Sequence, residues 1–185
     1  MSRDDDFDLD PEEGLEALEA LALALPRPSP SPGLRDRLLA SVAAPERRLA
    51  PFADRLAALF DVAVARASEL LAALADPRAW KALSPGIGLV DVDGGPAIAG
   101  ADVGFVRVEP GHTFPHHRHL GSERALILRG ALVESDGRIF RAGDEARMEA
   151  ESEHSFAAGP DEALVFAVVV FGVDLPGYER TTPAC

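Results

Sequence analysis

The stretch GHTFPHHRHLGSERALILRG, residues 111–130, decides how this sequence is interpreted, because it places four of the chain's five histidines within eight residues. Successive side chains of a β-strand point to opposite faces, so His117 and His119 share one face while His116 lies on the other. Glu123 follows Gly121, where the chain can turn and bring a carboxylate to the same point. Imidazole and carboxylate donors together suit zinc, iron, manganese or nickel.

One histidine lies outside this cluster, His154, which follows Glu123 by 31 residues. It would complete a set of three imidazoles and one carboxylate. The predicted metal ligands are therefore His117, His119, Glu123 and His154. The alternative is a group of surface histidines at a turn, with a hydrogen-bonded core histidine at position 154. His112 and His116 lie outside the shared face and are expected to contact solvent or to surround the ligands.

Composition excludes several classes of protein. The 185 residues have room for one good-sized domain and something smaller. The net charge is −13, and residues 1–25 alone hold nine acids and one base. An acidic chain repels phosphate backbones, so we expect no nucleic-acid partner. The acidic segment is expected to be a solvated tail or to dock onto a basic protein.

Cysteine usage and hydropathy give further bounds. The sole cysteine is Cys185, which rules out an internal disulfide or a cysteine zinc site. The apolar runs are much shorter than the about 20 residues that span a bilayer. No basic segment precedes an apolar core at the N-terminus, so we expect no signal peptide, no membrane contact and a cytoplasmic protein.

The chain divides into two halves with different patterns. Amphipathic helices are predicted over 12–25 and 33–43, and one or two more over 52–76. A stiff proline-rich tether, PRPSPSP, is predicted over 26–32. Beyond Trp80, short apolar runs alternate with glycine turns, which predicts strands over 87–92, 102–110, 123–135, 137–142 and 163–173. We therefore predict an α+β fold: a helical region over 1–78, then an antiparallel β-sandwich or β-barrel domain over 79–185.

The glycines, histidines and glutamate of the opening stretch match the first cupin motif without deviation. The matching residues are Gly111, His117, His119, Glu123 and Gly130. The chain thus resembles the cupin superfamily, and the resemblance implies a jelly-roll β-barrel that holds a metal. In the second cupin motif Gly143 and His154 are in register. Its proline, second glycine and asparagine are replaced by Glu149, Glu151 and Ala158. These replacements predict a weaker turn before His154 and make it the least firmly held ligand.

Within the superfamily, residues 79–172 resemble the cupin domain of ChrR-type anti-sigma factors, most distinctively in PHHRHLGSE and SEHSF. This resemblance implies zinc as the metal, a sensor domain that can bind a small molecule in the barrel, and a sigma factor as partner of the helical region. The segment LALPRPSPSPGLRDRLLASV also resembles the tether and helix with which such proteins hold the sigma factor. Family members with zinc in the N-terminal domain carry histidines and a Cys-x-x-Cys there, and this chain has neither. Any sigma-binding module in its helical region is therefore expected to be metal-free, shortened or no longer functional.

Two alternatives stay open. The chain could be a small metal-dependent cupin enzyme such as a dioxygenase, with open metal positions for substrate. Its amphipathic helices could instead cap the barrel or form a homodimer interface.

Overall fold

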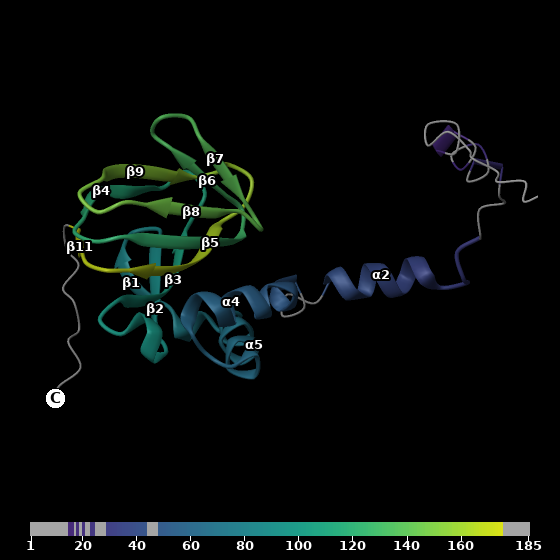
Figure 1. The fold of residues 1–185 in the computed structure, drawn as a ribbon, viewed down its shortest axis with the longest axis horizontal. Coiled ribbons are helices and arrows are strands. Elements are labelled where there is room, and N and C mark those ends of the chain that lie inside the picture. Colours follow the sequence, from purple (N-terminus) through teal and green to yellow (C-terminus); the bar gives the residue numbers. More distant parts are fainter. Residues whose placement is uncertain are drawn as a thin grey trace, which may run out of the picture. The chain divides into compact units, whose positions relative to one another are not determined.

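The structure, a computed structural model, describes residues 29–43 and 48–175 and six residues nearer the N-terminus (Figure 1). Those six are Leu15, Glu16, Leu18, Ala20, Leu23 and Ala24. Most of the predicted helix over 12–25, the acidic segment and the start of the proline tether lie outside this part of the chain. Two compact units are separated between Ser41 and Val42.

The helices follow the local start and stop signals. Helix α2, Leu34–Ala43, begins after Pro32-Gly33, and the Leu34 amide donates to the Ser31 carbonyl at 3.0 Å. Helix α4, Ala53–Phe60, follows the 3₁₀ turn Ala50–Phe52. It ends at Asp61, whose φ of 54° is left-handed, as is common just beyond a helix. Helix α5, Val64–Ala73, precedes a second 3₁₀ turn, Pro77–Ala79, that Asp76 caps.

Eleven strands among the described residues form two antiparallel sheets. Sheet A contains, in spatial order, β1 (Lys81–Ser84), β2 (Ile87–Asp91), β3 (Asp102–Val108), β10 (Leu164–Val170), β5 (Glu123–Arg129) and β8 (Glu145–Met148). Sheet B contains β11 (Val173–Asp174), β4 (Thr113–His119), β9 (Glu153–Ala158), β6 (Ala131–Glu134) and β7 (Ile139–Arg141). The predicted α+β fold with a jelly-roll β-domain is confirmed, although the two sheets are not closed into one continuous barrel.

The face of sheet A that looks toward sheet B contributes to the core between the sheets. Side chains of β5 and β10 such as Ile127 and Phe166 pack there against Phe114 and Phe156 of sheet B. Successive side chains of a strand alternate between faces, so the residues next to them point the other way. This explains why β10, LVFAVVV, is apolar at almost every position: both of its faces are covered.

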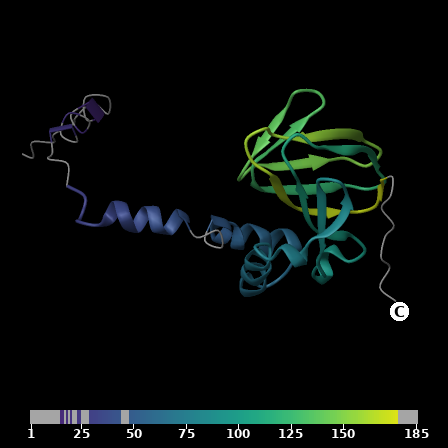
Figure 2. The ribbon, with the colours of Figure 1, turned by 180° about the vertical axis from the view of Figure 1, so that it is seen from behind.

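The other face of sheet A is covered by the α4–α5 hairpin, which Figure 2 shows from behind. Leu56 and Phe60 of α4 are fully buried against strand residues that include Phe105 and Leu126. Polar contacts fix the end of α4 as well: the Gly95 amide donates to the Phe60 carbonyl at 2.8 Å. The division that the sequence predicts at residue 78 stays a prediction, but the α4–α5 hairpin on its helical side shares a core with the sheet. No helix in the part of the chain that the structure describes is long and apolar enough to cross a membrane.

Candidate metal centre

Two neighbouring strands of sheet B carry the three histidines of the site. His117 and His119 lie on β4, and His154 lies on β9 directly opposite His117 in the strand register. A register shift between Phe114 and His117 changes the phase of β4, so that Phe114, His117 and His119 are all buried. The side chain of His116 is 65% exposed. The shared face that the sequence predicts for His117 and His119 is therefore what the strand forms.

The three imidazoles meet at one point. One nitrogen from each of His117, His119 and His154 lies within 4.8 Å of the others. The Nε2 atoms of His117 and His154 are 3.0 Å apart. Two nitrogens bound to one zinc ion in tetrahedral geometry would be about 3.3 Å apart, given bonds of about 2.0–2.1 Å. This pair therefore needs to move apart by only a few tenths of an ångström to hold an ion.

An oxygen acceptor lies behind each imidazole. The Nδ1 atom of His117 is 2.8 Å from the Pro115 carbonyl oxygen, and that of His154 is 2.9 Å from Glu134 Oε2. The Nδ1 atom of His119 is 3.5 Å from Glu123 Oε2. When Nδ1 carries the proton and donates it outward, the Nε2 lone pair is left for a metal. His117 and His154 share this arrangement, whereas the contact between His119 and Glu123 is not a hydrogen bond.

Electrostatics favour neutral histidines at this point. The pKa of His117 is lowered from 6.5 to about 4, chiefly by burial and to a smaller extent by the nearby His154 and His116, while the Pro115 hydrogen bond opposes the change. Burial and the two neighbouring imidazoles lower the pKa of His119 to about 4 in the same way. His119 is fully buried, and neither ring nitrogen has a hydrogen-bond partner among the described residues. Buried nitrogens without partners are costly, and a bound cation would satisfy them.

Glu123 comes from the other sheet and lies beside the cluster. It begins β5, and its side chain is only 12% exposed. Burial raises the pKa of its carboxyl from 4.5 to about 7, the charge of His154 lowers it and the charge of Glu134 raises it. Its carboxylate contacts His119 but is not part of the group of nitrogens that meet at one point. That Glu123 is the fourth ligand stays a prediction.

Glu134 is a buried member of the site that the motif spacing does not reveal. Its side chain is 1% exposed, and Oε1 has no hydrogen-bond partner in the part of the chain that the structure describes. The signal for it is the alternation of ALVE over β6, which places Glu134 on the same inward face as Leu132. An acidic residue at an inward position of an otherwise apolar strand needs a partner, and His154 is that partner.

The turn before His154 forms in spite of its altered motif. Glu151, at the position of the motif's second glycine, adopts a left-handed φ of 68°. Its amide donates to the His119 carbonyl at 2.7 Å, and the His119 amide donates to the Ser152 carbonyl at 2.9 Å. The glutamate thus adopts the conformation that glycine takes most easily, at some cost in strain.

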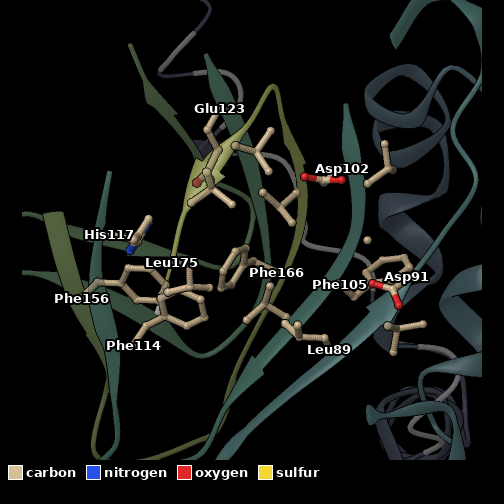
Figure 3. Close-up of a pocket in the computed structure, with 17 residues that line it drawn as sticks. Leu89, Asp91, Asp102, Phe105, Phe114, His117, Glu123, Phe156, Phe166 and Leu175 are labelled. Carbon is tan, nitrogen blue, oxygen red and sulfur yellow. The ribbon is translucent and has the colours of Figure 1, made fainter. Parts of the chain in front are cut away.

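A cavity of about 80 Å³ adjoins His117. Figure 3 shows His117 with Phe114 and Phe156 on one side of it and Asp91 on the other. Its wall is mostly apolar, and Glu123 is among the lining residues. None of the described residues that line it is a lysine or arginine. The cavity places a small, largely apolar space next to His117 and Glu123.

Two facing antiparallel sheets with inward imidazoles on paired strands are the architecture of a cupin that can hold a metal ion. The family model described as the ChrR cupin-like domain matches residues 69–172, from within α5 to the end of β10. Since this match spans more than half of the chain, the chain belongs to the ChrR cupin-like domain family. The predicted resemblance is confirmed.

Several solved structures are similar in fold. The complex of SigE with the anti-sigma ChrR from Rhodobacter sphaeroides matches at 22% identity and a TM-score of 0.48, over 85% of this chain and 75% of that chain. KdgF from Halomonas sp. matches at 20% identity and a TM-score of 0.42, over 49% of this chain and 85% of that chain. An acetylacetone dioxygenase from Acinetobacter johnsonii matches at 12% identity and a TM-score of 0.47, over 54% of this chain and 73% of that chain. None of these likenesses is strong enough to carry a function. A search of curated protein sequences found no match.

Proposed function

We propose that this protein is a cytoplasmic anti-sigma-like regulator, in which a metal-binding cupin domain over about 79–185 senses a signal and the helical region binds a sigma factor. The observation that carries the proposal is the cluster of three imidazoles, two buried and one half-buried, in a chain of the ChrR cupin-like family. Three imidazoles that converge on one point, two of them with an oxygen acceptor behind Nδ1, form a site suited to a divalent cation.

The proposed ligands are His117, His119, His154 and Glu123, and the proposed ion is zinc, with iron, manganese and nickel as alternatives. The nitrogens of the cluster suit all four metals, and the nearby carboxylate can close a four-ligand site. Bound at this point, such an ion acts as a Lewis acid or holds an exchangeable ligand.

Metal content tests this site. Protein purified without a histidine tag is expected to contain close to one metal ion per chain by mass spectrometry. The variant His117→Ala and the double variant His117→Ala/Glu123→Ala should both lose the metal ion. His112→Ala is the matched control, because His112 contacts the Pro110 carbonyl away from the cluster. Stoichiometric metal in the double variant would rule out the assignment.

The proposed partner contact lies on α2. Leu38 and Leu39 are 56% and 55% exposed on this helix. An amphipathic helix can lay such an apolar stripe into a groove of another protein. The acidic N-terminal segment would speed encounter with a basic surface, whereas the leucines would hold the complex.

Calorimetric titration against a sigma factor encoded near this gene tests the partner contact. Leu39→Asp should abolish binding and leave the metal content unchanged. Asp36→Ala, an exposed change on the same helix, should bind as the natural protein does. If residues 1–78 bind none of the sigma factors tested, the regulatory function is wrong.

A second candidate is a metal-dependent dioxygenase, and the cavity beside His117 and Glu123 favours it. This wall could hold a small, largely apolar substrate next to the metal. The iron-loaded protein would then consume O₂ with a small apolar substrate. Val168→Phe, which fills the cavity, should abolish consumption, whereas Ile139→Phe on an exposed strand should not. A regulator would show no such turnover.

A further inference from the structure

We propose that Glu134 is the positioning residue of the metal centre: it fixes the ring of His154 so that Nε2 faces the other two imidazoles. It thereby supplies the support that the altered second cupin motif lacks. The inference rests on the metal-binding part of the proposed function and concerns a residue outside the predicted ligand set.

The contact between Glu134 and His154 is short and protected from water. Glu134 Oε2 lies 2.9 Å from His154 Nδ1, and the two side chains are 1% and 10% exposed. A carboxylate is only an acceptor when ionised, so an ionised Glu134 would place the proton of this contact on Nδ1 of His154. Nε2 then carries the lone pair in the neutral ring, and it lies 3.0 Å from Nε2 of His117.

The backbone around Glu134 is held in place by its neighbours. Strand β6 pairs with β9, which carries His154, and Glu134 is opposite Phe156 in that register. The Glu134 amide donates to the Arg138 carbonyl at 2.9 Å across the β6–β7 hairpin. The Ser135 amide donates to the Ser155 carbonyl at 3.2 Å. The carboxylate therefore approaches His154 from a rigid strand pair, which is what a fixed ring orientation requires.

The burial of Glu134 distinguishes a functional from a merely structural carboxylate. An ionised carboxylate taken out of water costs several kcal/mol unless charge or hydrogen bonds offset the loss. Here Oε1 has no hydrogen-bond partner within the described ranges, and the one contact of Oε2 is to an imidazole. A divalent ion on the far side of His154 would supply the missing positive charge. Glu123 is the second buried carboxylate beside the cluster, so the two negative charges would match a divalent ion.

The competing interpretation is a structural ion pair in which His154 is doubly protonated. Its Nε2–H would then donate to Nε2 of His117, and no metal would be needed. The two interpretations differ in what happens when Glu134 is replaced. A positioning residue sets the metal affinity of the folded protein, whereas a structural ion pair sets only its stability.

The experiment measures zinc affinity by competition with a chromophoric chelator, together with the His154 ring nitrogens by ¹⁵N NMR. Glu134→Leu removes the acceptor, and the affinity is expected to fall about 10–100-fold, as for other groups that orient a metal ligand. Glu134→Gln keeps the volume and an acceptor oxygen, so it should keep the Nδ1–H form of His154 and lose affinity by less. Glu153→Gln is the matched control, since Glu153 neighbours His154 but pairs with exposed His116.

Each outcome decides the inference. An unchanged affinity in both Glu134 variants overturns it, as does a doubly protonated His154 at neutral pH in the metal-free protein. If Glu134→Leu fails to fold, Glu134→Gln decides, because only a positioning role predicts reduced affinity in a folded protein. If the natural protein binds no metal, the proposed function fails. The ¹⁵N spectra of the metal-free natural protein and Glu134→Gln then test the Nδ1–H assignment by themselves.

Discussion

Phe60 of α4 lies edge-on against Phe105 of β3, with ring centroids 5.3 Å apart and planes at 64°. Both side chains are essentially inaccessible to solvent, and they belong to the core between the α4–α5 hairpin and sheet A. Phe60→Ala is expected to lower the free energy of unfolding by about 3–5 kcal/mol, because it leaves a large cavity in a packed core. Urea denaturation measures this. Val64→Ala on the exposed start of α5 should change stability by less than about 0.5 kcal/mol.

The division predicted at residue 78 can be tested by truncation. The α4–α5 hairpin covers apolar strand residues such as Leu126, Val165 and Val169. A chain that starts at Leu83 would expose them to water, and we expect it to aggregate. A chain that starts at Arg48 keeps the hairpin and should be monomeric and folded by size-exclusion chromatography and circular dichroism. A soluble, folded chain from Leu83 would show instead that the cupin domain does not need the hairpin.

Glu123 is expected to make the metal-free protein less stable as pH rises. Its folded-state pKa is about 7 against an ordinary value of 4.5. Between these values the folded protein keeps a proton that the unfolded chain has lost, so the free energy of unfolding falls as pH rises from about 4.5 to 7. Above pH 7 the penalty is complete. Glu123→Gln removes it and should stabilise the metal-free protein at pH 8 by up to about 3 kcal/mol.

Two further measurements control this result. At pH 4.5 the variant and the natural protein should be equally stable, because the carboxyl is protonated in the folded state. Added zinc should raise the melting temperature of the natural protein more than that of Glu123→Gln, because the natural protein offers an additional ligand. A variant that is less stable than the natural protein at pH 8 without metal would contradict the buried position of Glu123.

The strained residue of the β8–β9 turn gives a stabilising prediction. Glu151 has a φ of 68°, a conformation that costs an L-residue roughly 1–2 kcal/mol. Glu151→Gly should therefore raise the free energy of unfolding by about 0.5–1 kcal/mol, after loss of its exposed ion pair with Arg118 and the greater freedom of glycine in the unfolded chain. Thermal unfolding measures the gain. Glu149→Gly in the same turn has no positive φ to relieve and should destabilise.

Much of the fold follows from local pattern. The strands with apolar, β-branched runs between glycine turns are β2, β3, β5, β6, β7 and β10, and all six fall within the predicted ranges. By contrast β1, KALS, is short, and its position is set by pairing with β2. The acidic sequence around β8 and β9 shows little apolar alternation, so the formation of these strands depends on pairing with their neighbours.

Part of the candidate site likewise follows from local sequence, and part depends on how the strands pair. The shared face of His117 and His119 follows from strand geometry, since i and i+2 point the same way. The nearness of His154 depends on the pairing of β4 with β9, which no spacing in the chain reveals. His154 is predicted as a ligand because it is the one histidine outside the cluster and because it matches the second cupin motif. Glu134 depends on a third strand, β6, that joins the sheet beside β9. The exact place of Glu123 depends on how two separate sheets face each other.

The origin of the four predicted ligands in both sheets has a mechanical consequence. The histidines belong to sheet B and Glu123 to sheet A. An ion bound by all four would therefore crosslink the two sheets. Release of that crosslink would act first on β5, whose inward residues line the space between the sheets and whose Leu126 and Leu128 contact the core beneath the helices. A single layer of strands thus separates the metal centre from the α4–α5 hairpin. A shift of β5 on the side of the metal would therefore displace the helices that pack on its other side.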